Sequence, residues 1–548
     1  MARNSTIMLC KNIKLDKNYQ NCLTYTEAQM VNLCNTNKVV YGNDFSFIRG
    51  EDNSINVPFS YANCITCNYM AFQNPRYSNK WFFAFIDSVD YISDGACKIN
   101  FTVDEFSTWF EYWTAKSCFV IREHVNDDTV GAHTVPEGLE TGEYIHSYSF
   151  NLYNASSSCY ICVGVTEVID EILINVDNTN YNNVFSGIKY ILCETPLATS
   201  HLIRIYDKKA KGDAINSIFV VPQDLVGTVT FTTVTYDNTT TQVAPVPNST
   251  TATLLATSSN IQPPTSIETY IPVNNKMFTY PYCYFYLSNN VGNDVIYHYE
   301  DFINNTAVFK VFGAICPSCS IKAIPLNYKK LAESSDPYST YSFNYGVMGA
   351  KLPMCSWVTD PYTNWLTQNG VNIAGVEINQ QDASLIGGIG AMLVGGALIA
   401  SGVGTMAGAG LIATGAGGIF TSMQSNYQKD MIPAQAKGSM SGGDIQYSLG
   451  RTAFQVFRMT IREEFARSID AYFTRFGYKV NSLKLPNQTG RRYFNYVEIG
   501  KSEIIGYPNN KGCPAESMEK INNIYRGGVT LWHDHARIGN FAENTINT

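Results

Sequence analysis

Apolar runs broken by Asn, Pro and Gly recur along the first half of the chain and predict a protein made mainly of β-strands. The runs are rich in aromatic and β-branched residues, which favour pleated, half-buried strands. The first of them are Val57–Tyr61, Tyr69–Phe72, Trp81–Ile86 and Cys97–Val103. Because the run Trp81–Ile86 is apolar at consecutive positions, we expect it to be covered on both faces of its sheet.

The same pattern continues further along the chain. Met277–Leu287 predicts a tyrosine-rich strand that turns at Asn289–Asn293 into Val295–Tyr299, as a β-hairpin does. Before it, Thr228–Ser266 consists mostly of Thr, Asn, Ser and Pro, with Asp237 as its one charged residue. We expect an exposed hairpin and an extended linker in that stretch.

Two short helices are predicted by capping residues that precede apolar residues at helical spacing. The first follows Thr26 and carries Met30, Leu33 and Cys34. The second is expected to begin with Thr102 as its cap. Its aromatic residues would lie on one side: Phe106, Trp109, Phe110 and Trp113.

The longest helix is predicted over Thr452–Phe476, followed by Gly477 as its end. Apolar residues recur every three or four positions: Phe454, Phe457, Ile461, Phe465, Ile469, Tyr472 and Phe476. Charged residues take the other faces: Arg458, Arg462, Glu463, Arg467, Asp470 and Arg475. We expect this helix to pack against a β domain, with its arginines in solvent or in salt bridges between subunits rather than on DNA.

One stretch, Ala383–Gln428, has no Asp, Glu, Lys or Arg and is mostly Gly, Ala and aliphatic residues. Full burial of one large apolar side chain is worth about 1.5–3 kcal/mol, so these side chains need cover. They are Leu385, Ile386, Ile389, Met392, Leu393, Val394, Leu398, Ile399, Val403, Met406, Leu411, Ile412, Ile419 and Phe420.

This apolar segment is divided near Ser401–Gly402 into halves that are each shorter than the roughly 20 residues of a membrane-spanning helix. Its many glycines disfavour helix in water, at about 1 kcal/mol each against alanine. In lipid, small residues at four-residue spacing allow helices to approach closely, as at Gly396, Ala400, Gly404 and Gly408. The composition therefore indicates a conditional membrane element, stored elsewhere until it is released.

Glycines and prolines on both sides of the segment are typical of hinges. The residues expected to act in this way are Gly370, Pro433, Gly438, Gly442 and Gly443. Three other interpretations stay open: a resident transmembrane hairpin, a flexible Gly-rich linker and a hairpin buried in the core. Few Lys or Arg residues flank the segment, which disfavours the first, and the aliphatic residues disfavour the second.

Composition adds constraints on the partners. The chain has 548 residues, enough for several domains, and only 15% of them are charged, where about 25% is usual. A surface so poor in charge suits permanent protein contacts, so we expect an oligomer. The net charge of −8 argues against a tight grip on nucleic acid through its phosphates, although DNA could still slide past. The N-terminus lacks the apolar stretch of a secretory signal, which predicts synthesis in the cytosol.

Candidate chemical groups are few. The 15 cysteines include three CxxC pairs, Cys64–Cys67, Cys159–Cys162 and Cys316–Cys319, and their wide separation favours free thiols over a zinc site. We expect His124, in the polar run Arg122–Glu123–His124, to be structural rather than catalytic. His533 and His535 could form a metal pair, but no third ligand is near in sequence. No catalytic residue, metal or cofactor is predicted.

A resemblance to a known family rests on several ordered segments. They are YMAFQNPRYSNKWFFAFIDSVDY at 69–91, INFTVDEFSTW at 99–109, CFVIREHV at 118–125, PEGL at 136–139 and YPYCYFYLSNNVGND at 280–294. Together they resemble the distal tail tube or tail knob proteins of small short-tailed phages with protein-primed linear genomes. The likeness is clear over 60–140 and continues in outline to about residue 300.

The resemblance implies a mainly β, multidomain tail tube subunit with a few helices and a long Gly/Ala-rich apolar loop inserted late in the chain. We expect an N-terminal β-rich tube domain at 1–150 and further β domains at 151–345, with the Thr/Pro-rich insertion at 228–266. A hinge-flanked loop would follow at 346–443, with its core at 383–428, and an α+β segment at 444–548 would return to the tube.

The implied function is that of a structural protein, made in the host cytoplasm and located in the virion at the distal end of the tail. Subunits would form a hexamer that contacts other tail proteins of the proximal tube, lower collar and tail tip. Viral double-stranded DNA would pass through its channel. The apolar loops would plug the tube and then enter the host cytoplasmic membrane transiently. A tail-tip enzyme that degrades the cell wall and a free pore-forming protein are the alternatives.

Overall fold

The computed structural model describes residues 5–547 apart from 46–52, 156–157, 173, 175, 177–179, 182–183, 186–187, 248–252, 316–318, 327, 329–344, 358–435 and 438–445. The chain divides into two compact units. Unit 1 contains Met1–Glu143, Thr265–Tyr282 and Ile461–Thr548, and unit 2 contains Tyr144–Pro264 and Cys283–Thr460. Unit 1 is therefore assembled from three separate stretches of sequence.

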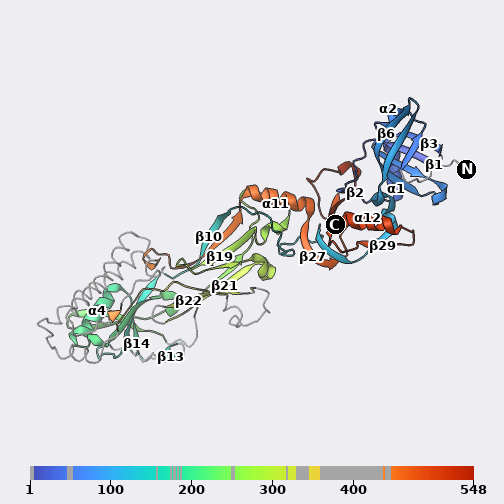
Figure 1. The fold of residues 1–548 in the computed structure, drawn as a ribbon. Helices are drawn as coiled ribbons and strands as arrows, with labels where there is room; N and C mark the ends of the chain where they lie inside the picture. Colours follow the sequence, from blue (N-terminus) through green and yellow to red (C-terminus); the bar gives the residue numbers. More distant parts are fainter. Residues whose placement is uncertain are drawn as a thin grey trace, which may run out of the picture. The chain divides into compact units, whose positions relative to one another are not determined.

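The N-terminal part of unit 1 is a six-stranded sheet in the order β3-β1-β5-β6-β7-β4 (Figure 1). Its strands are β1 Ser5–Cys10, β3 Lys38–Phe45, β4 Ser54–Val57, β5 Tyr69–Gln73, β6 Trp81–Ser93 and β7 Ala96–Val103. All the pairings in this sheet are antiparallel. Two helices accompany it, α1 Glu27–Asn37 and α2 Tyr61–Cys64.

A second sheet of unit 1 has the order β2-β30-β28-β9-β27 and joins the two ends of the chain. Its strands are β2 Asn21–Leu23, β9 Cys118–Glu123, β27 Tyr478–Lys484, β28 Phe494–Ile499 and β30 Val529–Trp532. Beside it lie a two-stranded sheet, β8 Trp113–Ala115 with β29 Gly506–Pro508, and the helices α3 Glu105–Trp109, α11 Glu463–Phe476 and α12 Ala515–Arg526. In Figure 1 the blue β2 and the red C-terminal elements accordingly belong to one body.

The strand β6 is buried on both faces at its beginning, as the apolar run predicts. Phe83 and Phe85 belong to one core cluster of unit 1, together with Trp532 from the other end of the chain. Ala84 belongs to a different cluster with Phe72, on the opposite face of the same sheet. Beyond Ile86 the strand becomes mostly exposed. The first half of β6 therefore forms part of the core, and the second half forms the surface.

Unit 2 contains three larger sheets. The seven-stranded sheet has the order β16-β17-β14-β11-β15-β24-β25, and the two four-stranded sheets have the orders β10-β26-β19-β20 and β18-β21-β22-β23. The first has the strands β11 Cys159–Val165, β14 Lys189–Cys193, β15 Ile215–Pro222, β16 Thr232–Tyr236, β17 Thr239–Pro245, β24 Met354–Trp357 and β25 Ala436–Lys437. The others have β10 Tyr144–Asn154, β18 Thr253–Ile261, β19 Cys283–Ser288, β20 Asp294–Tyr297, β21 Ala307–Ala314, β22 Ser320–Leu326, β23 Val347–Met348 and β26 Ala453–Ile461.

One continuous apolar core runs through unit 2, from Leu152 to Val456 in sequence. It includes an aromatic group in which Phe285, Tyr297, Phe302 and Phe309 contact one another. A short pair, β12 Asn180–Tyr181 with β13 Val184–Phe185, and the helices α4 Pro196–Lys208 and α5 Gln223–Val226 complete the unit.

The first predicted helix is confirmed, and the second begins later than predicted. Thr26 caps α1 in a capping box with Gln29. Thr102, in contrast, is still part of strand β7, and its hydroxyl donates to Asp87 at 2.6 Å. The cap of α3 is Asp104, whose side chain accepts from the backbone N–H of Ser107 at 3.1 Å. Because Thr102 is paired in the sheet, the helix starts later, and Asp104 is the next residue whose side chain can cap it.

The predicted helix over Thr452–Phe476 is wrong in its first third, because Ala453–Ile461 is strand β26. This strand pairs antiparallel with β19 from Cys283↔Thr460 to Ser288↔Gln455. Short apolar runs fit both helix and strand periods, so an available strand edge decides the outcome. The helix α11 begins after Arg462, where Glu463 and Glu464 lie near the positive end of the helix dipole.

The two predicted hairpins are confirmed in part. Phe285 pairs with Tyr297, as the tyrosine-rich hairpin requires, although the first strand begins only at Cys283. Within Thr228–Ser266 the hairpin is β16–β17, turned by Asp237 and Asn238 in the left-handed region. The expected linker is instead the strand β18, which pairs with β21.

The described residues confirm the mainly β fold class. The apolar segment 383–428 and the hinge positions lie outside the described residues. The four domain ranges expected from the sequence stay a prediction.

Gly477 gives a test of how tightly the second sheet of unit 1 is packed at the end of α11. Its φ is +66°, and an added Cβ would lie 2.2 Å from the carbonyl oxygen of Glu123. In Gly477→Ala, the positive φ alone should cost about 1–3 kcal/mol. The total loss of stability should be larger, because backbone atoms near the new Cβ would also have to move. Calorimetric unfolding measures the loss.

The matched control is Gly512→Ala, where φ is +84° but no atom lies within 4 Å of the added Cβ. This variant should lose only the strain. Equal losses for the two variants would contradict the packing argument.

Candidate functional site

The fourteen apolar residues and five hinge residues predicted from the sequence lie outside the described residues. The structure does describe where the chain leaves the seven-stranded sheet before this segment and where it returns. It leaves through β24 and returns through β25, which pair antiparallel as Ser356↔Lys437 and Trp357↔Ala436. The β24 strand also pairs with β15. The residues just before and just after 358–435 are thus paired with each other, with β25 at the edge of the sheet.

The glycines that precede this segment are packed closely against their neighbours. An added Cβ on Gly346 would lie 2.7 Å from the carbonyl oxygen of Ala323. The N–H of Gly349 donates to Ile321 at 2.7 Å. At these two positions glycine allows close contact between backbones.

A buried ion cluster joins the three stretches of unit 1. Glu137, whose side chain is fully buried, forms ion pairs with Arg122 and Lys276. Its Oε1 also accepts from the backbone N–H of Lys479 at 2.9 Å. Lys276 donates further to the carbonyl of Val135 at 2.9 Å. Burial lowers the pKa of Lys276, and the charge of Glu137 opposes this shift.

Two neighbours from the same polar run have structural contacts. Glu123 is buried, pairs with Lys484, and accepts from the backbone N–H of Asn487 at 2.7 Å. The His124 ring accepts at Nδ1 from the N–H of Tyr496 at 2.7 Å, and its Nε2 contacts the carbonyl of Thr474 at 3.1 Å. Burial lowers the pKa of His124 to about 3, so the ring is neutral. With both nitrogens occupied, His124 is a structural residue, as predicted.

Asp470 lies on the buried face of α11, which corrects its assignment to the polar faces of the predicted helix. It is 1% exposed. Its carboxylate accepts from the hydroxyl of Tyr270 at 2.6 Å and from the backbone N–H groups of Val273 and Asn274 at 2.8 and 3.0 Å. The side chain of Asn274 donates to it as well, at 2.8 Å. Asp470 thus binds the stretch 265–282 to the helix, and no local sequence pattern signals this contact.

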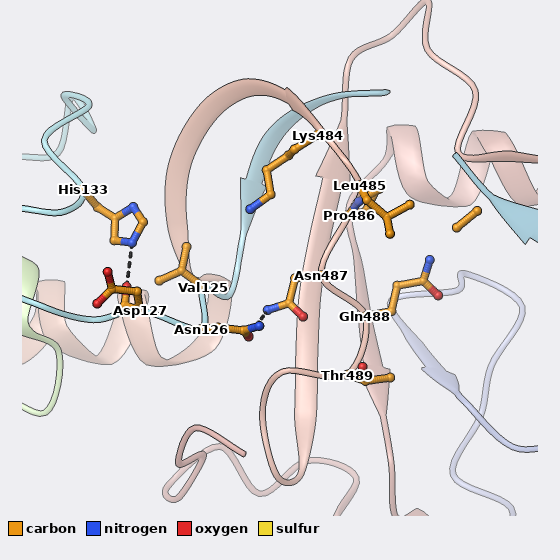
Figure 2. Close-up of a pocket in the computed structure, with 11 residues that line it drawn as sticks. Val125, Asn126, Asp127, His133, Lys484, Leu485, Pro486, Asn487, Gln488 and Thr489 are labelled. Atoms are coloured by element: carbon orange, nitrogen blue, oxygen red, sulfur yellow. Dashed lines mark hydrogen bonds between the residues drawn. The ribbon is translucent and has the colours of Figure 1, made fainter. Parts of the chain in front are cut away.

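A groove of about 620 Å³ lies in unit 1, and Figure 2 shows the residues that line it. It is lined by the loop Lys484–Thr489, by Val125–Asp127 and by His133 and Ala115. The His133 ring points toward Asp127 and contacts its carbonyl at 2.7 Å, and Asn487 donates to Asn126 at 2.6 Å. The lining is therefore a mixture of apolar, amide and charged or titratable groups, and two of its contacts join lining residues to each other.

The cysteines described by the structure are free and mostly buried. Burial raises the pKa of Cys67 to about 11 and that of Cys159 to about 12, so their thiols stay protonated. Cys162 and Cys319 are likewise buried, and Cys316 is outside the described residues. The interpretation of CxxC pairs as buried free thiols fits the described members.

The histidine pair near the C-terminus does not converge on one point. His533 contacts the Thr24 hydroxyl at 2.8 Å and Asn495 at 3.0 Å, whereas His535 accepts from the backbone N–H of Lys14 at 3.1 Å. Within the part of the chain that the structure describes, no group of three His, Cys, Asp or Glu residues is arranged to hold a metal ion.

Comparison with known proteins adds family membership. Residues 228–546 match the family model described as Bacillus phage phi29, Tail knob protein gp9, C-terminal domain. The chain belongs to this tail knob protein family. Residues 3–114 match a second family model, the Caudoviral major tail protein N-terminus, which covers the six-stranded sheet of unit 1.

Whole-length relatives agree. The chain is 22% identical over 608 aligned positions to tail knob protein gp9 of Bacillus phage phi29, covering 99% of this chain and 98% of that protein. It is 24% identical to the protein of the same name from Bacillus phage B103, with 85% of each chain covered. The solved structure of the bacteriophage C1 tail knob protein gp12 matches 99% of this chain and 100% of that one, at a TM-score of 0.61 and 12% identity, which shows a shared fold.

These matches confirm the resemblance found in the sequence. The chain is a structural tail protein of a virion, at the distal end of the tail, and its relatives are named as tail components rather than enzymes. Among the described residues, no helix combines the length and apolar character needed to cross a bilayer.

The ion cluster around Glu137 predicts a strong coupling between charges. Glu137→Gln would leave Arg122 and Lys276 buried without their anion, which should cost about 3–5 kcal/mol. Lys276→Met should also destabilise unit 1, and the double variant should lose less than the two single losses added together. Chemical unfolding of the four proteins measures this cycle.

The control for this cycle is Arg467→Gln. The Arg467 side chain is 56% exposed and forms a salt bridge with Glu463. It should change stability by about 0.3–0.5 kcal/mol. A loss below about 1 kcal/mol for Glu137→Gln would show that the cluster does not hold unit 1 together.

His124 predicts acid sensitivity. Its pKa is about 3 in the folded protein, against an ordinary value of 6.5. Below about pH 6.5, His124 is protonated in the unfolded chain but stays neutral in the folded protein. The free energy of unfolding therefore falls by up to about 1.4 kcal/mol per pH unit as the pH is lowered toward 4. Unfolding measured from pH 7 to 4 should show a shallower decline for His124→Gln than for the wild type. The same slope for wild type and His124→Gln would refute the prediction.

Proposed function

We propose that this tail knob protein forms a ring, a hexamer by analogy, around a channel for double-stranded DNA. The apolar segment 383–428 plugs the distal mouth of the channel before infection. During ejection it enters the host cytoplasmic membrane and forms a conduit for the genome. Two observations carry the proposal: the stretch 383–428 has no charged residue, and the strands β24 and β25, which precede and follow 358–435, pair with each other.

The energetics require two environments that both exclude water from the segment. In the plug, neighbouring subunits cover one another's aliphatic side chains, and in the membrane lipid covers them. Because both states bury similar apolar area, a small difference in free energy is enough to switch between them. The pairing of β24 with β25 supports the switch, because these strands precede and follow 358–435 and can stay paired while the apolar segment changes its surroundings.

The charge of the chain supports a channel rather than a DNA clamp. A net charge of −8 disfavours tight binding of DNA phosphates. A chain with only 15% charged residues suits lasting contacts with other subunits and tail proteins. The partners in the virion are then the proximal tube, the lower collar and the tail tip, and the membrane is a transient partner.

Deletion of 385–420, joined by a short Gly/Ser linker that keeps β24 and β25, should give particles that assemble but leak or fail to deliver DNA. A second variant keeps the length and glycines and replaces the fourteen large apolar residues with Ser. It should fail in the same way, because the apolar surface is what lipid must cover. Particle yield by electron microscopy, plaque titre and dye release from liposomes measure assembly, delivery and membrane activity.

The matched control replaces Leu385 and Leu393 with Ile, which preserves apolar volume and should preserve infectivity. Normal infectivity of the Ser variant would refute the membrane role. Failure of either variant to assemble would instead favour a hairpin buried in the core. If the purified wild-type protein has the mass of a monomer in solution, the proposed oligomeric channel is refuted.

A further inference from the structure

The free edge of the second sheet in unit 1 carries an apolar stripe. The strand β27 is the last in the order β2-β30-β28-β9-β27, and Leu483 on it lies directly opposite Phe119 on β9. Directly opposed residues in a sheet share a face, and Leu485 is the first residue after the end of β27. Their exposed fractions are 73% for Leu483, 57% for Leu485 and 39% for Phe119.

Two lysines lie near this stripe, which we name the β27 stripe (Phe119, Leu483 and Leu485). Lys484 is not one of them, because successive residues of a strand face opposite ways and it pairs with the buried Glu123. Lys116 precedes Phe119 by three residues, and Lys501 follows Gly500, whose N–H donates to the Phe119 carbonyl at 2.9 Å. One acid, Glu503, also contacts this surface and accepts from the Phe119 N–H at 3.2 Å. The β27 stripe is thus apolar with a cationic margin.

A second surface of unit 1 has the opposite charge. The hairpin of β6 and β7 ends in an exposed tip (Asp90–Asp94), where Tyr91 is 59% and Ile92 is 51% exposed. Asp94 accepts from the Tyr91 hydroxyl at 2.8 Å, and Asp90 accepts from Asn100 at 2.9 Å. Lys98 lies opposite Asp90 in the ladder, but neither aspartate forms a salt bridge with a described residue. The tip is apolar with an anionic margin.

We propose that the hairpin tip of one subunit docks on the β27 stripe of the next. Tyr91 and Ile92 would cover Phe119, Leu483 and Leu485, while the aspartates of the tip meet the lysines of the stripe. The groove beside Leu485, about 620 Å³ in volume, offers room at the end of the stripe for a side chain from the tip.

The charge pattern favours a second copy of this chain as the occupant. Each subunit carries one tip and one stripe on different sheets of the same unit, and the two match in both apolar content and charge. A contact between unlike surfaces of identical subunits is head-to-tail, and it closes into a ring when the rotation between subunits permits. The inference rests on the proposed ring and names the residues that would hold it together.

Charge reversal tests the pairing. Asp90→Lys with Asp94→Lys places cations against the lysines, and Lys116→Glu with Lys501→Glu places acids against the aspartates. Each pair of changes should weaken self-association of the purified protein at least tenfold, measured by sedimentation velocity in low salt. The four changes combined should restore association, because attraction returns with the charges exchanged. Disruption by both pairs without restoration in the combination would overturn the proposed partner.

Leu483→Glu should also dissociate the ring, and Leu197→Glu should not. Leu197 is 65% exposed on α4 of unit 2 and serves as the matched control. Melting temperatures equal to that of the wild type would show that the variants fold. If the wild type forms rings and Leu483→Glu forms the same rings, this inference is wrong and the proposed ring stands. If the wild type is monomeric throughout, the proposed ring itself is wrong.

A cross-link identifies the contact directly. Ile92→Cys with Leu483→Cys should give a ladder of covalent oligomers under mild oxidation, ending at the number of subunits in the ring. Either substitution alone should give no ladder, since the wild-type cysteines described by the structure are mostly buried. Absence of the ladder in a protein that still forms rings would place the two residues in different parts of the assembly.

Discussion

Three stretches far apart in the sequence must meet to form unit 1, and they meet at the buried carboxylate of Glu137. It binds Arg122 from the first stretch, Lys276 from the second and the backbone of Lys479 from the third. A buried carboxylate is tolerated only when cations and hydrogen-bond donors replace the water it has lost. Correct assembly of the three stretches satisfies this demand, and so the charge selects one arrangement of the chain.

Asp470 applies the same constraint a short distance along α11. Its carboxylate receives the donors of Tyr270, Val273 and Asn274, so the middle stretch is held to the third by several charge-assisted hydrogen bonds. These contacts keep a segment that links two parts of unit 2 firmly inside unit 1. The buried acids of unit 1 thus connect stretches that are far apart in sequence, beside the contacts of its apolar cores.

The apolar segment 383–428 differs from unit 1 in how it is suited to surroundings without water. Unit 1 buries charge by pairing it, whereas segment 383–428 has no charge and depends on surroundings that exclude water. In the proposed function, this segment exchanges one water-excluding environment for another, while the strands β24 and β25 that precede and follow 358–435 stay paired.

The sequence alone determined the mainly β fold, the helix α1, the double-sided burial of β6, the structural role of His124 and the family, because these follow from local periodicity, capping or ordered motifs. It placed Ala453–Ile461 in a helix, although pairing with β19 makes it a strand. It also put Asp470 on a polar face, although donors from nearly 200 residues away bury it. Only the tertiary structure decided these points, because partners distant in sequence determine whether a short apolar run becomes a strand and whether a carboxylate can leave water.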